Sequence, residues 1–215
     1  MKNEELFNTI SEAVKQSVSQ NISQMPSLND LPHMEPHLLA LYRETHLVTL
    51  LSLHNVSIIM QGVLLEALVK EIIYDKERVD FQQPLGTAIN RCRDREYLDS
   101  DELEFLDAFK NNYRNTYQHG DIKKLSEGKT VQAWPIEIDP KNIAGIRKRI
   151  EDVKQNRAGE PQSIGYNQFR PVGYIIKQVI DQEQALPLFI EVDKFFREML
   201  GKYLPPLKTA NKNLG

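Results

Sequence analysis

The segment from residue 56 to residue 73 constrains the fold of this chain more than any other. Its apolar residues cover nearly the whole circumference of a helix rather than one face. A helix of this kind is expected at the centre of a helix bundle or in a dimer interface. The wider apolar region, 47–65, is broken by polar residues and a glycine: Thr49, Ser52, His54, Asn55, Ser57, Gln61 and Gly62. It therefore predicts a buried helix and not a membrane span.

Elsewhere the apolar residues recur mostly every three or four positions, which is the helical period. This spacing predicts helices over 4–24, 38–77 (as one helix or as two in sequence), 84–92, 100–119, 140–156 and 172–203. Ser100 is the predicted N-cap of the helix that begins there, with Glu102 in its first turn. We therefore predict an all-α fold, in which an up-and-down helix bundle carries one short extended insertion.

Composition shifts and prolines divide the chain into segments. Residues 1–35 predict an N-terminal amphipathic helix and a proline-containing linker. Residues 36–204 predict the helical bundle, with the insertion at about 121–171, and residues 205–215 predict a flexible tail.

The insertion departs from the helical pattern. Residues 131–139 alternate and predict a short strand or an extended flap, whereas residues 158–171 predict a loop. Basic residues between 141 and 157 either meet phosphates or, as we prefer because acidic residues interrupt them, form a solvated helix face. Trp134 either stacks on unpaired bases or, in the interpretation we prefer, anchors the flap on the bundle.

The charge of the whole chain gives no general attraction for nucleic acid. The formal net charge is -3, so any RNA must be recognised by a local patch or by two chains together. The single cysteine, Cys92, excludes an intrachain disulfide and a cysteine-based zinc cluster. His33 and His37 have helical spacing, but Pro32 and Pro36 prevent a regular helix through them, so we predict no metal and no cofactor. Without a leader-like sequence or an apolar span, we expect a cytoplasmic protein and no membrane partner.

Candidate catalytic residues lie within residues 113–121. Arg114 and His119 are near the end of a predicted helix that Gly120 terminates. Arginine binds phosphate oxygens bidentately, and histidine transfers protons near neutral pH. RNA cleavage by the internal 2′-hydroxyl needs both functions. On a straight helix, side chains five positions apart point about 140° apart, so the helix end must distort or a second chain must contribute.

This segment resembles the signature of the HEPN superfamily of helical bundles, in which arginine, usually followed by a polar residue, precedes a histidine. Arg114, Asn115 and His119 match that signature, and residues 64–68 are similar to the preceding core helix of one bacterial branch. The resemblance covers about residues 40–120 and extends to the C-terminal helix. It implies a homodimer whose composite cleft holds Arg114 and His119 from both chains, with Asn115 orienting the active groups or the substrate.

The resemblance also implies an activity, a metal-independent endoribonuclease in bacterial defence, stress or RNA processing. RNA is then the substrate, and an antitoxin or defence-system protein of a toxin–antitoxin or phage-defence setting is a further partner. The alternative is an inactive dimeric helical module that binds RNA, a nucleotide or a protein. On that interpretation Arg114 pairs with a surface carboxylate such as Asp107 or Glu104, and His119 only caps its helix.

Three further residues are candidates for the surroundings of the motif, namely Glu66, Asp121 and Tyr117. Glu66 lies in the apolar helix, where an unpaired carboxylate is costly. It is therefore a partner of Arg114 or His119, part of a structural ion pair, or at an exposed edge. Asp121 is placed to raise the pKa of His119. One branch of the superfamily has a tyrosine at this position that receives AMP, and the aspartate argues against that modification here.

Overall fold

The computed structural model describes residues 3–118, 120–134, 143–155, 159–165, 167 and 172–204. Its elements are α1 (Asn3–Asn21), α2 (Pro36–Leu50), α3 (His54–Glu77), α4 (Leu85–Asp94), α5 (Ser100–Phe109), the π-helical turn η1 (Lys110–Arg114), α6 (Asn115–Gln118), α7 (Ile122–Ser126), β1 (Thr130–Ala133), α8 (Ile143–Lys154), β2 (Gln162–Gly165) and α9 (Val172–Tyr203). The predicted all-α helical fold is confirmed. The chain divides into two compact units, which we call unit 1 (Met1–Gly120 with Asp181–Gly215) and unit 2 (Asp121–Ile180).

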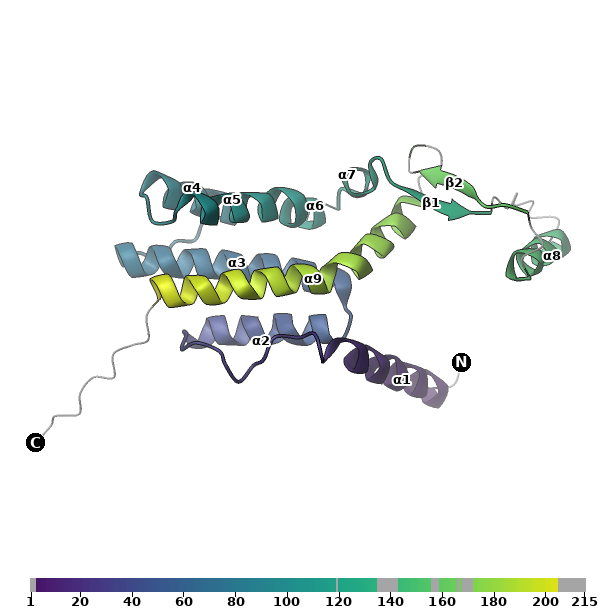
Figure 1. Cartoon of the computed structure of the whole chain (residues 1–215), viewed down its shortest axis with the longest axis horizontal. Coiled ribbons are helices and arrows are strands. Elements are labelled where there is room, and N and C mark those ends of the chain that lie inside the picture. The colour runs from purple at the N-terminus through teal and green to yellow at the C-terminus, as the bar shows by residue number, and fades with distance from the viewer. Residues whose placement is uncertain are drawn as a thin grey trace, which may run out of the picture. The chain divides into compact units, whose positions relative to one another are not determined.

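The central helix of unit 1 is α3. Its side chains Leu64, Leu65, Leu68 and Ile72 are fully buried. In Figure 1 the helices α4 and α5 lie on one side of α3, and α2 lies on the other. The apolar circumference of residues 56–73 is therefore covered from several directions, as a central bundle helix requires. The predicted helical region 38–77 is two helices, because the chain turns at Ser52 with a positive φ of 56°.

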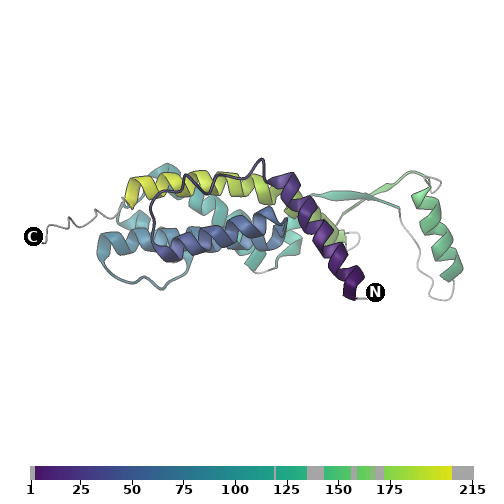
Figure 2. The same cartoon turned by 90° about the horizontal axis from the view of Figure 1, so that it is seen from below.

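The C-terminal part of α9 runs beside α2 in unit 1 (Figure 2). The hydroxyl group of Tyr42 donates a hydrogen bond of 2.5 Å to Asp193, and the Tyr42 ring stacks on Phe196 at a centroid distance of 5.4 Å. Burial, together with the neighbouring carboxylate of Asp193, raises the pKa of Tyr42 above its ordinary value. The tyrosine is therefore a neutral hydrogen-bond donor within the core.

The proline-containing segment after α1 is held against this core. Arg197 donates to the backbone carbonyl groups of Asp30 at 2.9 Å and Ser27 at 2.8 Å. The buried His46 ring contacts the carbonyl oxygen of Pro26 at 3.0 Å, as expected of a core histidine with a satisfied ring nitrogen. The predicted linker is therefore part of unit 1, because its backbone acceptors are bound by side chains of α2 and α9.

Unit 2 is built around a short antiparallel hairpin. β1 pairs with β2 so that Val131 lies opposite Ile164, and both pack against the buried Ile176 and Ile180 of α9. The prediction of an extended segment near residue 131 is confirmed for Thr130–Ala133, and residues 135–139 lie outside the described residues.

The sequence pattern missed two elements of unit 2. The loop predicted over 158–171 contains the strand β2, which forms because β1 supplies its hydrogen-bonding partners. The short helix α7 was not predicted. The indole Nε1 of Trp134 donates to the carbonyl group of Gly159 at 2.8 Å, which is a contact within unit 2, and its predicted anchoring on the bundle stays a prediction. The predicted tail, residues 205–215, lies outside the described residues.

Candidate functional site

The helix that carries the motif begins with a capping box. Asp99, and not the predicted Ser100, is the N-cap residue: its carboxylate accepts the Glu102 N–H at 3.0 Å, and Glu102 accepts the Asp99 N–H at 2.8 Å. Such reciprocal bonds satisfy two of the unpaired N–H groups of the first turn. Lys202 of α9 also contacts Asp99 at 2.7 Å, which fixes the start of α5 to the bundle.

The motif helix is distorted over Lys110–Arg114. The N–H of Asn115 bonds to the carbonyl oxygen of Lys110, a spacing of one residue more than in an α-helix. A π-turn of this kind rotates the residues that follow it, and such turns are frequent at functional sites. The π-turn spans Lys110–Arg114 and so includes Arg114 as its last residue. His119 lies outside the described residues, so the convergence of the two side chains stays a prediction.

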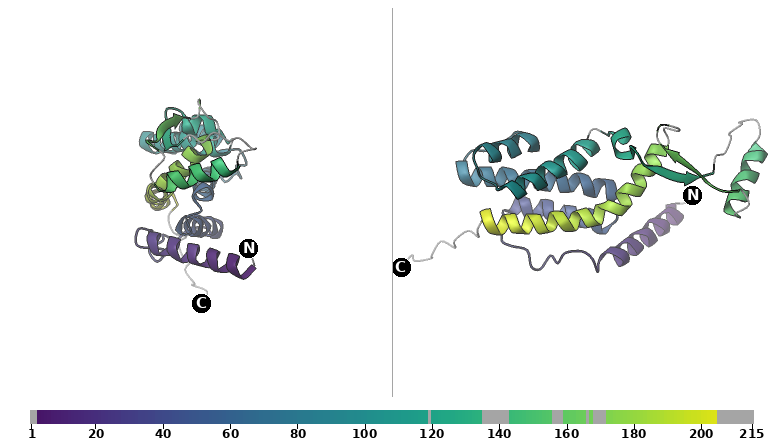
Figure 3. Two further views of the ribbon diagram at one scale, coloured as in Figure 1. Left: turned by 90° about the vertical axis from the view of Figure 1, so that its right-hand side faces the viewer. Right: turned by 45° about the horizontal axis from the view of Figure 1, so that its top comes forward.

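Arg114 reaches from the π-turn to α3, and the motif helix runs along α3 in Figure 3. Its Nη2 donates to Oε2 of Glu66 at 2.6 Å, and only 15% of the Arg114 side chain is exposed. Gly62 of α3 lies beside this arrangement, and a Cβ atom there would be in ordinary van der Waals contact with Cγ of Arg114, 3.5 Å away. The alternative interpretation that Arg114 pairs with Asp107 is wrong, because Asp107 binds Lys110 and Arg93 instead.

Glu66 is the centre of the site. Its Oε1 accepts from Nζ of Lys70 at 2.8 Å, and its Oε2 accepts from Arg114 and from the N–H of Leu85 at 3.2 Å. Burial alone would raise the pKa of Glu66, but the hydrogen bond from Lys70 and the charges of Arg114 and Lys70 outweigh it and lower the pKa below its usual value. Glu66 is therefore a carboxylate at neutral pH, and two cations share its single negative charge.

The sequence pattern did not single out Lys70. It lies one helical turn after Glu66, and that spacing is a known signal for a side-chain ion pair. Lys70 lies within the apolar run of residues 56–73, where the periodicity predicts burial and not an ion pair. With Lys70 included, the site holds two positive charges and one negative charge, so it carries a surplus of positive charge that favours an anionic ligand.

Arg114 retains hydrogen-bonding capacity. Its Nε is buried and has no hydrogen-bond partner within the described part of the chain. A buried, unpaired donor on a charged group is costly, and native structures rarely tolerate one without a reason. The guanidinium group is thus oriented by Glu66 but not saturated by it.

The other predicted site residues lie in different surroundings. Asn115 is half-buried at the start of α6. Tyr117 is buried and donates a hydrogen bond to the buried carboxylate of Asp181, and burial together with that carboxylate raises its pKa. Asp121 belongs to unit 2, where it caps α7 by accepting the Lys124 N–H at 3.0 Å. Its predicted effect on His119 stays a prediction.

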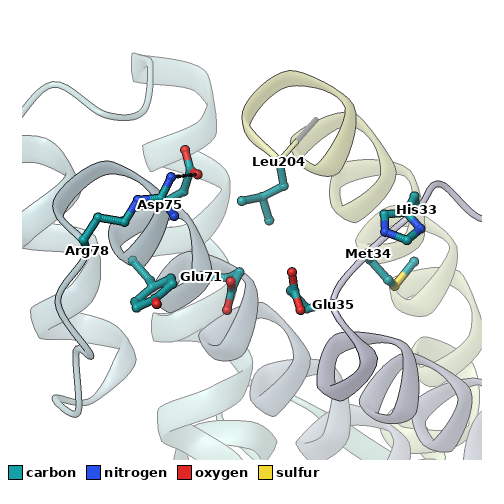
Figure 4. A pocket seen from close by; sticks show the side chains of 8 residues that line it. His33, Met34, Glu35, Glu71, Asp75, Arg78 and Leu204 are labelled. Atoms are coloured by element: carbon teal, nitrogen blue, oxygen red, sulfur yellow. Dashed lines mark hydrogen bonds and ion pairs between the residues drawn. The ribbon is translucent and has the colours of Figure 1, made fainter. Parts of the chain in front are cut away.

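A separate pocket of about 170 Å³ in unit 1 does not suit an anion. Figure 4 shows the carboxylates of Glu35 and Glu71 in the same hollow, with Arg78 already bound to Asp75. Burial raises the pKa of Glu71, and the nearby charges of Glu35 and Asp75 act in the same direction against the opposing charge of His37. This acidic pocket would repel a phosphate, so it is a poorer candidate for an anionic ligand than the surroundings of Arg114.

No family model matches this chain, and no curated protein and no solved structure is significantly similar to it. Within the described residues, no group of three or more histidine, cysteine, aspartate and glutamate side chains has an arrangement that would hold a metal ion. Over the same residues, every helix is too short or too polar to cross a membrane.

Proposed function

We propose that this chain is a metal-independent endoribonuclease of the HEPN type, acting as a homodimer in bacterial defence, stress or RNA processing. The observation that carries the proposal is the state of Arg114. Its guanidinium group is held by Glu66 at 2.6 Å yet keeps a buried Nε without a partner among the described residues. Lys70 adds a second cation on the same carboxylate. This arrangement is suited to a phosphate, which accepts hydrogen bonds from an arginine in a fork.

In the proposed reaction, the 2′-oxygen of one nucleotide attacks the adjacent phosphorus, and the bond from phosphorus to the 5′-oxygen of the next nucleotide breaks. His119 takes the proton from the 2′-hydroxyl group or supplies a proton to the leaving 5′-oxygen, and the His119 of a second chain would perform the other transfer. Arg114 would stabilise the extra negative charge on the phosphorane. The products are a 2′,3′-cyclic phosphate and a 5′-hydroxyl end.

One observation favours the alternative, an inactive helical module that binds RNA, a nucleotide or a protein. One face of the Arg114 guanidinium already has an ionic partner, and most of the side chain is buried. A ligand would then have to reach the remaining donors or displace Glu66. The two proposals differ in what happens to RNA after it is bound, and this difference can be measured.

The test is cleavage of a mixed single-stranded RNA pool in EDTA by the wild-type chain, Arg114→Ala and His119→Ala at equal purity. Removing a group that stabilises transition-state charge typically costs about 10²- to 10³-fold in rate. We expect a loss of that size for Arg114→Ala and loss of detectable cleavage for His119→Ala. The cleaved ends should carry a cyclic phosphate.

The matched control is Arg78→Ala, which removes an exposed arginine from its surface ion pair with Asp75 and should leave cleavage unchanged. Equal cleavage by all four proteins would mean that the activity belongs to another site or to a contaminant. RNA that binds the wild-type chain without being cut would favour the inactive module.

A further inference from the structure

Positive charge is concentrated in unit 2. Residues Asp121–Ile180 contain 11 of the 27 lysine and arginine residues of the chain but only 7 of its 30 aspartate and glutamate residues. The formal net charge of this segment is therefore +4, whereas that of the whole chain is -3. The negative net charge of the whole chain thus includes a local region of positive charge. Charge asymmetry of this kind indicates an anionic partner.

Several cations of unit 2 are exposed, whereas many cations of unit 1 are bound within the fold. In unit 1 many cations are bound to carboxylates; they include Lys70, Arg91, Arg93, Lys110, Arg114, Arg197 and Lys202. In unit 2 the side chains of Lys123, Lys129, Arg147 and Lys148 are exposed. Over the residues that the structure describes, these four form no ion pair. Their charge is available to a ligand.

Two of these lysines, Lys123 and Lys129, line a pocket of about 280 Å³ where the chain passes from α7 into β1. The other residues of its wall are Ser126, Glu127, Gly128, Thr130, Gly165 and Asn167. Gly128 has a positive φ of 70°, and a Cβ atom there would meet nothing within 4 Å, so the backbone of this turn is open to a ligand. Two cations face one carboxylate, Glu127, which leaves a surplus of positive charge.

The hairpin beside this pocket packs one face on α9 and exposes polar side chains on the other. Val131 and Ile164 face inward onto Ile176 and Ile180, so alternation along the strands turns Gln132 and Ser163 outward, where both are exposed. A surface with polar side chains and lysines suits a phosphate backbone better than a lipid bilayer, which requires apolar side chains that enter the membrane interface.

We propose that this surface of unit 2, with Lys123 and Lys129 at its centre, binds the backbone phosphates of single-stranded RNA. The proposal rests on the proposed function, since it identifies a part of the chain that would hold the RNA substrate outside the cleavage site. Binding is through charge and polar groups, so it is tolerant of sequence and weakens with salt. The basic face of α8, which the sequence led us to interpret as merely solvated, adds Arg147 and Lys148 to the same positively charged unit.

The test measures RNA binding in the full chain carrying His119→Ala, so that the RNA is not cut. Fluorescence anisotropy with a labelled single-stranded RNA of mixed sequence is recorded over a range of salt concentrations. Adding Lys123→Gln and Lys129→Gln should weaken binding about tenfold and reduce the slope of log affinity against log salt by about 0.7 for each phosphate that the variant no longer neutralises. The double substitution to arginine, Lys123→Arg with Lys129→Arg, should retain the affinity.

The matched control is Lys15→Gln with Lys194→Gln, which removes two exposed lysines of unit 1 and should leave affinity and slope unchanged. Unchanged binding by the Lys123 and Lys129 variant, or equal losses in both double variants, would overturn the proposal. So would a loss of binding to anionic phosphatidylserine vesicles without any loss of RNA binding, which would point to a membrane. Because wild-type cleavage in EDTA is measured separately, the ribonuclease function can stand while this surface is rejected. Failure of the His119→Ala chain to bind RNA would reject this surface, whereas failure of the wild-type chain to cleave RNA in EDTA would reject the ribonuclease function.

Discussion

Arg114 and Arg197 are two partly buried arginines of unit 1, with 15% and 21% of their side chains exposed. Arg197 donates through every nitrogen of its guanidinium group. Its Nε binds both carboxylate oxygens of Asp193, at 2.8 and 3.0 Å, Nη1 binds the carbonyl oxygen of Asp30, and Nη2 binds the carbonyl oxygen of Ser27 and the hydroxyl group of Tyr42. Arg114 donates through Nη2 to Glu66, and its buried Nε has no partner among the described residues.

The difference separates a structural arginine from a candidate functional one. A side chain that serves only the fold gains most when all its donors are satisfied, because each unsatisfied donor keeps its desolvation cost. Arg197 has reached that state, with every guanidinium nitrogen already bound within the fold. Arg114 is oriented by one strong contact, and its buried Nε has no partner within the described part of the chain, a cost that a side chain serving only the fold would not be expected to carry.

The largest expected effect is on stability, from Arg197→Ala. This change leaves the carboxylate of Asp193 buried without its cation and removes the donors that hold the segment after α1. Breaking a buried ion pair by deleting one partner costs about 3–5 kcal/mol. We expect a loss of that order in the free energy of unfolding, measured by urea denaturation.

The comparison variant for that experiment is Arg114→Ala. Glu66 would keep its hydrogen bonds from Lys70 and from the Leu85 N–H, so the expected loss in unfolding free energy is about 1 kcal/mol. Equal losses of unfolding free energy in the two variants would contradict the distinction between a structural and a candidate functional arginine. A large loss of cleavage with a small loss of stability for Arg114→Ala would sharpen it.

A smaller effect is expected for Glu66→Gln, and it depends on pH. The pKa of Glu66 is lowered in the folded state, so the carboxylate contributes stability above the unfolded-state pKa of about 4.3 and loses it as the pH falls through the lower folded-state pKa. The variant should be about 2 kcal/mol less stable than wild type at neutral pH. The difference in unfolding free energy between the two proteins should decrease below about pH 4, because protonation of Glu66 removes its charge in the wild-type chain.

Urea denaturation of both proteins at neutral and acidic pH measures that gap, and the other carboxyl groups, present in both chains, largely cancel in the difference. The same loss at every pH would show that the ionised state of Glu66 does not matter to the fold. Arg114 would then need a different explanation for its orientation.

The smallest expected effect is a gain, from Gly62→Ala. The new Cβ atom would lie 3.5 Å from Cγ of Arg114 and 3.5 Å from Cε1 of Phe109, which is ordinary van der Waals contact. Replacing glycine in a helix interior by alanine typically stabilises by about 1 kcal/mol. We expect a raised melting temperature in calorimetry with unchanged cleavage. A stabilised protein with impaired cleavage would mean that even a methyl group beside Arg114 disturbs its working position.

Much of the helical fold was predictable because it depends on local pattern. The prolines at 36 and 84 mark the starts of α2 and α4, and the periodic apolar residues of 172–203 match α9 from end to end. These signals act within a few residues of chain. β2 was missed for the opposite reason, because this short strand forms only by pairing with β1. The two strands are separated in the sequence by α8.

The candidate site shows the same division. Sequence identified Arg114, His119 and Glu66 as residue types suited to phosphate chemistry or to its support, because charge and spacing can be read directly. The contact between Arg114 and Glu66 joins residues 48 positions apart, and the π-turn that directs Arg114 toward α3 has no local signature that we recognised. The role of Lys70 followed only once Glu66 was seen to be shared by two cations.

The sequence by itself determined that this chain forms helices and that most apolar residues of 56–73 are buried. It also predicted that an arginine and a histidine lie near the end of one helix. Those properties follow from periodicity, capping and side-chain chemistry within one segment. Only the tertiary structure decided which guanidinium donors are bound within the fold and which have no partner among the described residues. Arg197 and Arg114 have the same side chain, and the acceptors that distant segments bring to each one separate the structural residue from the candidate functional residue.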